Sequence, residues 1–383
     1  MNQPNVRDRT EGWDIDTIGD QWRGSVLGTE YSLHQLSPYI GKMKSAMAGS
    51  LISSFTSRGN TLYDPFSGSG TIALEAWAAN RNIIANDLSP YAHLLTQAKL
   101  SPTISVKEAL IKIELTAADV KDIIPDVDLS SVPLWVQSFF QPDTLREVIS
   151  WVQVLSAQKS YFLLACLLGI LHHQRPGFLS YPSSHTVPYL RIKKFPKDIY
   201  PELYEYRPVQ ERLEKKVIRA LRRVPILNQD IIRESHMCDA STFAPQQKID
   251  CIITSPAYMR RLDYARDNRL RLWFMGVSDW KALDHTISSS EDDFLKLMKC
   301  CLNIWRTVLV PDGLCVLVLG DSYSRSHKLA LPDLVANMAT KEIGGYSIQW
   351  KYSEVIPDDR RVRRDCSGNI KETILVLSND KGK

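Results

Sequence analysis

The sequence predicts an α/β fold with a doubly wound, mostly parallel sheet and a largely helical insertion. Residues 61–87 have the pattern of a strand, a glycine-rich turn, a helix and a second strand, which together form a βαβ unit. Alternating strands and helices resume after residue 230 and continue toward the C-terminus. The residues between these regions, about 101–230, are mainly helical in pattern. Because strands that alternate with helices form parallel sheets, we expect both strand-rich regions to share one sheet.

Each element has its own signal. A helix is expected within 33–60, where Met43, Met47, Leu51 and Phe55 recur at near-helical spacing. Within the βαβ unit we expect a strand at 61–63, a helix at 71–79 and a strand at 82–87. Further strands are expected at 231–238, 249–253, 313–319 and 370–377. We therefore predict an N-terminal arm (1–32), a catalytic domain (33–100 and 231–383) and a helical insertion (101–230), which is the candidate target-recognition region.

Composition is that of a globular protein with a substantial core. The chain has 383 residues, of which 44% are hydrophobic and 23% charged, and its net charge is +4. None of the 7 cysteines forms a Cys-x-x-Cys pair or has histidines at zinc-ligand spacing, so we expect free thiols and no metal. The polar N-terminus lacks the apolar segment of a signal peptide, and the longest apolar run, 161–171, is too short to cross a bilayer. The expected location is the cytoplasm.

The glycine-rich turn is the first candidate site. It consists of Asp64, Pro65, Phe66, Ser67, Gly68, Ser69, Gly70 and Thr71. Gly68 and Gly70 allow a sharp turn and a close approach of a ligand to the backbone. The turn lacks both the third glycine of a dinucleotide site and the Lys-Ser/Thr of a nucleotide-triphosphate loop. Asp64 would repel a pyrophosphate but can accept hydrogen bonds from an ammonium group, which favours the amino-acid end of S-adenosylmethionine.

Two further acids follow predicted strands. Asp87 ends the second strand of the βαβ unit, where a carboxylate in this topology binds ribose hydroxyls. Its alternative role is to cap the helix that begins near Pro90. Asp239 follows a later strand and could accept a hydrogen bond from an adenine amino group, or could instead cap a loop. Both acids are candidate cofactor ligands.

The second candidate site is Thr254 to Tyr258, which follows an apolar strand. An exocyclic base amine is a poor nucleophile because its lone pair is delocalised into the ring. The Ser255 hydroxyl and the Pro256 carbonyl could hold the amine hydrogens and direct the lone pair, and Tyr258 could stack on a base flipped from the helix. The absence of a Pro-Cys dipeptide argues against methylation of a ring carbon. In isolation, the same residues could form a plain surface turn.

These segments resemble the DNA amino-methyltransferases, which methylate N4 of cytosine or N6 of adenine. The family motif Asp-Pro-Phe-x-Gly-Ser-Gly-Thr matches residues 64–71 in full. Ser255-Pro256-Ala257-Tyr258 matches Asp/Asn/Ser-Pro-Pro-Tyr/Phe except at Ala257. Residues 36–43, which include Lys42, resemble the family's N-terminal motif beside the methionine part of the cofactor. The resemblance implies a Rossmann-like S-adenosylmethionine methyltransferase fold, and the leading serine favours cytosine N4.

A DNA methyltransferase also needs a basic surface. The candidate phosphate contacts are Lys193, Lys194, Arg260, Arg261 and Arg361, which belong to three basic clusters. The resemblance implies double-stranded DNA as the partner and a role in restriction-modification or in the protection of phage or host DNA, with a cognate restriction nuclease as a candidate partner. Two alternatives remain open at this point. One is an RNA guanine-N2 methyltransferase with similar motifs, and the other is an inactive nucleic-acid-binding module, which the Ala257 departure would suit.

Overall fold

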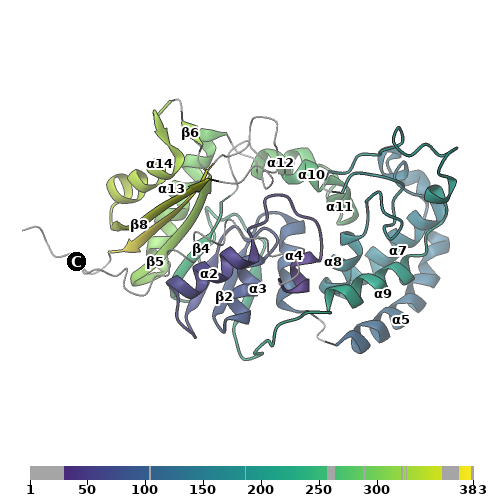
Figure 1. The fold of residues 1–383 in the computed structure, drawn as a ribbon, viewed down its shortest axis with the longest axis horizontal. Helices are drawn as coiled ribbons and strands as arrows, with labels where there is room; N and C mark the ends of the chain where they lie inside the picture. Colours follow the sequence, from purple (N-terminus) through teal and green to yellow (C-terminus); the bar gives the residue numbers. More distant parts are fainter. Residues whose placement is uncertain are drawn as a thin grey trace, which may run out of the picture.

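A central sheet and a helical region occupy the two halves of the molecule (Figure 1). The computed structural model describes residues 30–102, 105–185, 187–256, 264–287, 290–320, 322–324, 326–355 and 371–380. The sheet has seven strands in the order β3-β2-β1-β4-β5-β9-β8. They are β1 (Thr61–Asp64), β2 (Asn82–Asn86), β3 (Arg233–His236), β4 (Ile249–Thr254), β5 (Leu309–Gly320), β8 (Tyr346–Val355) and β9 (Lys371–Asn379).

Most of the sheet is parallel, as the sequence predicts. Strands β3, β2, β1, β4 and β5 pair in parallel, whereas β9 is antiparallel to both β5 and β8. Each strand predicted from the sequence is present. Strand β8 was not predicted, because it is an edge strand in which partly buried and exposed residues alternate, so it lacks a continuous apolar run. A separate two-stranded sheet joins β6 (Tyr323–Ser324) and β7 (Leu329–Ala330).

Helices cover both faces of the sheet. The first face packs against α2 (Ser45–Phe55), α3 (Thr71–Ala78) and α4 (Pro90–Leu100), and the second against α13 (Glu291–Val308) and α14 (Leu331–Asn337). Consecutive strand residues alternate between the faces, since Leu62 belongs to the first core and Tyr63 to the second. This arrangement confirms the predicted doubly wound α/β class. It also directs the carboxyl ends of β1, β2 and β4 to one edge, where such folds bind ligands.

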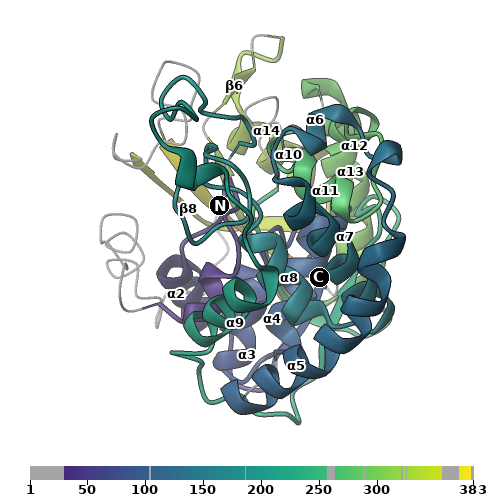
Figure 2. The same ribbon diagram turned by 90° about the vertical axis from the view of Figure 1, so that its right-hand side faces the viewer.

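Residues 101–230 form a helical region that packs beside α4. Its helices are α5 (Val106–Ile123), α6 (Leu134–Gln137), α7 (Pro142–Ala157), α8 (Tyr161–Gly169) and α9 (Val209–Ala220). Helix α8 lies against α4 in both views (Figures 1 and 2), and its apolar residues share one core with α2, α3 and α4. Short helices α10 (Tyr264–Asp267), α11 (Arg269–Phe274) and α12 (Trp280–Ile287) lie along the upper side of Figure 1, between the sheet and this region.

The remaining helical turns are short. They are Ser32–Gln35, Ile124–Asp126, Leu129–Ser131, Pro201–Tyr204 and Met338–Ile343. Within the part of the chain that the structure describes, every helix is too short or too polar to cross a bilayer. Among those same residues, His, Cys, Asp and Glu side chains do not gather in groups of three or more that could hold a metal ion.

Candidate active site

The glycine-rich turn connects β1 to α3 in a conformation that glycine favours. Gly68 and Gly70 have φ angles of +52° and +70°, in the left-handed region. A Cβ atom on Gly70 would lie 2.9 Å from the Thr96 Cα and 2.8 Å from its Oγ1, so α4 leaves no room for a side chain here. The Gly68 amide donates to Asp87 Oδ2 at 2.8 Å, and the Ser67 amide donates to the Asn86 carbonyl at 2.9 Å. The end of β2 therefore holds the turn in place.

A Gly70→Ala variant is expected to lose both stability and cofactor binding. The left-handed φ alone costs about 1–2 kcal/mol for a non-glycine residue, and the contact with the Thr96 backbone adds to that penalty. Gly59→Ala is the matched control, because Gly59 has a φ of +84° with open space around its Cβ position. Chemical denaturation should show a larger loss of unfolding free energy for Gly70→Ala, and only this variant should bind cofactor weakly in calorimetry. Equal losses would contradict the assigned role of the Thr96 contact.

Asp64 is a buried carboxylate at the end of β1. Its residue is 1% exposed, and its Oδ1 accepts a hydrogen bond from Thr254 Oγ1 at 2.7 Å, which ties the end of β1 to the end of β4. Burial raises the pKa of the Asp64 carboxyl to about 7, although hydrogen bonds from Thr254 and the Phe66 backbone oppose this rise. A carboxylate in this state is stabilised by a nearby cation, such as an ammonium or sulfonium group.

Asp87 follows β2 and supports the turn directly. Its two oxygens accept hydrogen bonds from the Gly68 amide and, at 2.9 Å, from the Ser89 amide. Burial raises the pKa of the Asp87 carboxyl to about 6 against these hydrogen bonds. The alternative role of Asp87 as the cap of the next helix is wrong. Ser89 caps α4 instead, since its Oγ accepts from the Ala92 amide at 3.5 Å and it directly precedes Pro90, where the helix begins.

Asp239 and Lys42 make local contacts at the edge of the same site. Asp239 Oδ1 accepts from the amide and the hydroxyl of Ser241 at 2.8 and 2.7 Å, so its loop-capping role is present. The Asp239 residue is nonetheless exposed, so its carboxylate remains accessible to a ligand. Lys42 Nζ donates to the His34 carbonyl at 2.9 Å. Burial lowers the pKa of the Lys42 ammonium, and the nearby Glu30 opposes this effect.

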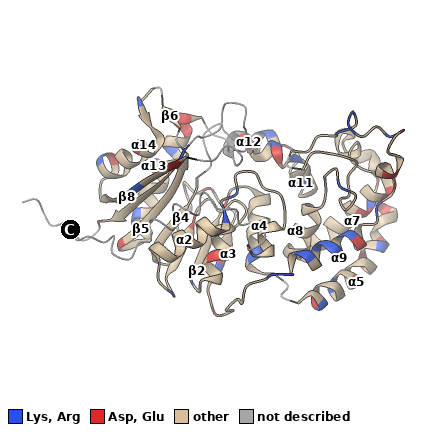
Figure 3. Ribbon diagram, in the orientation of Figure 1, with Lys and Arg blue, Asp and Glu red and all other residues tan. Residues whose placement is uncertain are grey.

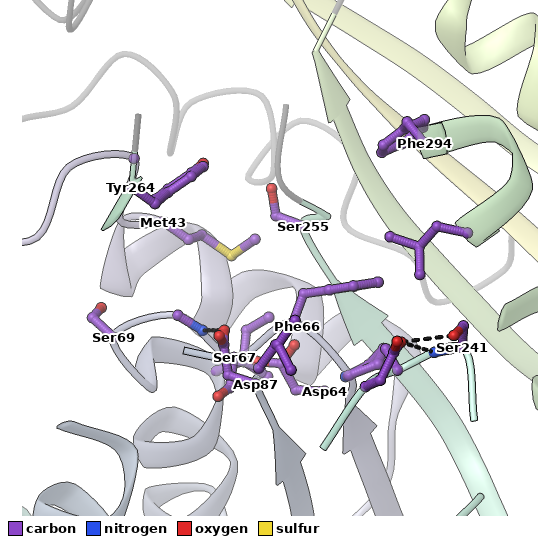
Figure 4. A pocket seen from close by; sticks show the side chains of 18 of the residues that line it. Met43, Asp64, Phe66, Ser67, Ser69, Asp87, Ser241, Ser255, Tyr264 and Phe294 are labelled. Carbon is purple, nitrogen blue, oxygen red and sulfur yellow. Dashed lines mark hydrogen bonds between the residues drawn. The ribbon is translucent and has the colours of Figure 1, made fainter. Parts of the chain in front are cut away.

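One cavity of about 440 Å³ joins these residues (Figure 4). Of the predicted site residues, it is lined by Lys42, Asp64, Pro65, Phe66, Ser67, Gly68, Ser69, Thr71, Asp87, Asp239 and Ser255. Ser255 directly follows β4 and lies between Tyr264 and Phe294 in the view of Figure 4. Gly70 and Pro256 are buried and are not part of the lining. The structure thus brings the two predicted segments together around one space.

Other predicted residues lie elsewhere. Tyr258, Arg260, Arg261 and Arg361, together with Ala257, fall outside the described residues. Lys193 and Lys194 are exposed on the irregular part of the helical region and do not line the cavity.

Part of the cavity wall was missed from the sequence. Helix α13 contributes Asp293, Phe294, Lys296, Leu297 and Cys300. A local signal for this helix exists, because Ser290 caps it and three acids, Glu291 to Asp293, occupy its first turn. That signal indicates a helix but not its position beside the glycine-rich turn, 220 or more residues earlier in the chain. Tyr39 and Tyr264 also line the cavity, and their rings lie 6.3 Å apart between centroids.

The side chains that line the cavity fit S-adenosylmethionine. Asp64 is a buried acid and Asp87 a partly buried one, and their raised pKa values favour a cationic or hydroxyl-bearing partner. Phe66, Phe294 and Leu297 provide apolar surface in the same cavity for a nucleobase ring and a methyl group. Cofactor cavities commonly combine a mostly apolar lining with a few polar groups that orient the ligand, and have volumes in this range.

Comparison with known proteins also points to a methyltransferase. Residues 2–98 match the model of the N6/N4 methyltransferase family, which is described as DNA methylase. These residues are thus similar to DNA methylases, which agrees with the predicted family, enzyme class and cofactor S-adenosylmethionine. The matched region includes the glycine-rich turn and Asp87 but ends before Ser255. None of the curated proteins matches the chain significantly.

Several solved structures are similar to the chain at low identity. TrmN from Thermus thermophilus is 12% identical with a TM-score of 0.35, and the alignment covers 91% of this chain and 52% of TrmN, so the chain spans about half of that protein. The rRNA methyltransferase aviRa from Streptomyces viridochromogenes is 11% identical with a TM-score of 0.35 and coverages of 94% and 97%. A TehB-like SAM-dependent methyltransferase from Corynebacterium glutamicum is 11% identical with a TM-score of 0.32 and coverages of 95% and 97%.

Proposed function

We propose that the chain transfers a methyl group from S-adenosylmethionine to an exocyclic base amine in double-stranded DNA, with N4 of cytosine preferred over N6 of adenine. The observation that carries this proposal is the shared cavity of Asp64 and Ser255. These residues end β1 and follow β4, which are paired neighbours in the sheet, and the Thr254–Asp64 hydrogen bond fixes their relation. A base held at Ser255 would therefore lie in the same space as the cofactor.

Each part of the site has a role in the proposal. Asp64 and Lys42 hold the charged amino-acid end of the cofactor, Asp87 holds the ribose hydroxyls, and Asp239 accepts from the adenine amino group. The cofactor supplies an electrophilic methyl group. Ser255 Oγ and the Pro256 carbonyl accept the amine hydrogens, which orients the nitrogen lone pair, and Tyr258 stacks on the base. The reaction then depends on positioning rather than on a covalent intermediate.

The wider biological role follows from the substrate. We infer that residues 101–230 take part in target recognition and that Lys193, Lys194, Arg260, Arg261 and Arg361 contact phosphates. Site-specific methylation would then protect DNA against a cognate restriction nuclease. The leading serine of the Ser255 segment supports cytosine, while the family description includes both N4 and N6 methylation.

Radiolabelled cofactor tests the substrate directly. Purified protein is incubated with methyl-labelled S-adenosylmethionine and either unmethylated duplex DNA or structured RNA. We expect label in DNA, and digestion to nucleosides should place it in N4-methylcytosine. Label confined to RNA would overturn the DNA assignment, and label in N6-methyladenine would overturn the base preference. Cofactor binding without transfer to any nucleic acid would support an inactive binding module. Modification-aware sequencing of DNA from expressing cells would then identify the recognition site.

A further inference from the structure

An unusually basic loop lies at the outer end of the helical region. Residues 170–197, which follow α8, contain no aspartate or glutamate, yet they include five lysines and arginines. A solvated charged face normally mixes both signs, as α5 does with Lys107, Glu108, Lys112 and Glu114. Figure 3 shows Lys and Arg positions along the irregular loop at the upper right, whereas α5, with both colours, lies at the lower edge. One-signed charge of this kind raises the local concentration of a polyanion.

The loop has a defined structure. The Ser184 amide donates to the Tyr189 carbonyl at 2.9 Å, and the Arg191 amide donates to the Pro182 carbonyl at 2.8 Å, which closes a tight hairpin. Arg191 Nη1 donates to Gln174 Oε1 at 2.8 Å, so the hairpin is joined to the turn that carries Arg175. These contacts fix the hairpin and the turn, which carry the basic side chains, relative to each other.

Large apolar side chains are exposed among these cations. Tyr189 is 49% exposed and Ile192 is 52% exposed. The Arg191 guanidinium carbon lies 5.7 Å from the centroid of the Tyr189 ring, so the ring supports the cation rather than a hydrophobic core. We define the basic loop surface as Arg175, Tyr189, Arg191, Ile192, Lys193 and Lys194. Exposed aromatic and aliphatic groups between cations suit a partner that offers both phosphates and base or sugar surfaces.

Two arginines of this surface lie close to His173. Burial lowers the pKa of His173, and the positive charges of Arg175 and Arg191 lower it further, so both cations lie close to this ring. The His173 and His185 rings are 4.5 Å apart between centroids, which places a second titratable side chain with these cations. A neighbouring phosphate would relieve this concentration of positive charge.

Two hydrogen bonds at the start of α11 connect the basic loop to a residue that lines the cavity. Arg269 Nη2 of α11 donates a hydrogen bond to the Pro188 carbonyl, next to Tyr189. Asn268, which precedes Arg269, donates through Nδ2 to the carbonyl of Tyr264 at 3.0 Å, and Tyr264 lines the cavity. The loop is therefore positioned by the same helices that follow the catalytic segment.

We propose that the basic loop surface binds the phosphate backbone of the duplex DNA whose target base enters the cavity, and that the Arg269–Pro188 hydrogen bond holds the loop in place relative to the cavity. This inference rests on the proposed function, because it assumes a DNA substrate at the Ser255 cavity. The loop supplies affinity and register, while recognition of the base remains with the cavity.

The test is a triple variant, Arg175→Gln, Lys193→Gln and Lys194→Gln, in the full chain. All three residues are exposed, so the substitutions should leave the fold intact. The matched control is the triple variant Lys107→Gln, Lys112→Gln and Lys121→Gln, which removes the same charge from exposed positions on α5. The probe is an unmethylated duplex of genomic sequence, and its dissociation constant is measured by anisotropy over a series of salt concentrations with the cofactor analogue sinefungin present.

The logarithm of the association constant falls linearly with the logarithm of the salt concentration, and the loss of three phosphate contacts should make this slope less steep by about 2.7. Binding should also weaken on the order of a hundredfold near 0.1 M salt. The control should keep the wild-type slope, and both variants should keep wild-type affinity for the cofactor in calorimetry. A wild-type slope in the loop variant, or equal losses in both variants, would overturn this inference and the phosphate contacts assigned to Lys193 and Lys194, while leaving the proposed methyl transfer to DNA standing. If the wild-type protein bound and methylated only RNA, the proposed function itself would fail.

Discussion

A Ser255→Ala variant is expected to bind S-adenosylmethionine with wild-type affinity while its rate of methyl transfer falls by about 10²-fold. Ser255 lines the cavity at the end of β4, on the side of Tyr264 and Phe294, while Asp64 and Asp87 lie at the ends of β1 and β2. Loss of its hydroxyl removes one acceptor for the amine hydrogens without changing the cofactor contacts. Loss of one preorganised hydrogen bond to a reacting group typically lowers kcat by 10²–10³-fold.

The measurement is single-turnover transfer of labelled methyl to duplex DNA, together with calorimetric cofactor binding. Ser255→Asn is the conservative comparison, because its side-chain carbonyl restores an acceptor at the same position, and it should recover part of the rate. Full activity in Ser255→Ala would show that Ser255 has no role in methyl transfer. A loss of cofactor affinity as large as the loss of rate would show that Ser255 contacts the cofactor instead of the base.

An Asp64→Asn variant should be more stable than the wild-type protein without cofactor at pH 8, and should bind the cofactor about 10–100-fold more weakly. The pKa of the Asp64 carboxyl is about 7 in the folded protein, compared with an ordinary value of 3.8. Because the folded value is raised, the ionised carboxylate destabilises the fold, and this loss develops as the pH rises from about 4 to about 7. The difference amounts to about 4 kcal/mol above pH 7.

Asparagine can preserve the local hydrogen bonds while removing the charge. Its oxygen can accept from the Phe66 backbone and its amide can donate to Thr254 Oγ1, whose hydroxyl is free to rotate. The variant loses only the attraction between a carboxylate and the cationic end of the cofactor, and a charged hydrogen bond contributes about 1.5–3 kcal/mol. Stability and affinity should therefore change in opposite directions.

Thermal unfolding between pH 4 and 8 and calorimetric titration would measure both effects. Asp250→Asn is the control, since Asp250 lies on β4 beside β1 and accepts from the Thr61 amide at 2.8 Å, at the opposite edge of the sheet from the cavity. It removes the same charge and should leave cofactor affinity unchanged. Cofactor affinity of the wild-type protein should rise with pH between about 6 and 8 as Asp64 ionises, and this rise should flatten in Asp64→Asn. An unchanged affinity in Asp64→Asn would refute its role as a cofactor ligand.

Local backbone requirements explain why much of the site is visible in the sequence. Gly68 and Gly70 are needed for left-handed turns, and an acid at the end of each neighbouring strand lies at the ligand-binding edge of a parallel sheet. These features depend on residues within about 25 positions of one another. The βαβ unit and the positions of its two acids at the strand ends were therefore predicted correctly, whereas the cap of α4 is Ser89 rather than the alternative, Asp87.

The tertiary structure alone decided which distant segments share the cavity. The Thr254–Asp64 hydrogen bond joins residues 190 positions apart, and α13 reaches the glycine-rich turn only because β4 and β5 are neighbours in the sheet. The contact of Arg269 with Pro188 likewise follows from the packing of α11 against the helical region. Periodicity and motif spacing describe local conformation, whereas strand order and helix packing depend on how apolar faces are buried together. The sequence therefore predicted the fold class and the cofactor loop, and the packed structure determined how Ser255, α13 and the basic loop surface are arranged around it.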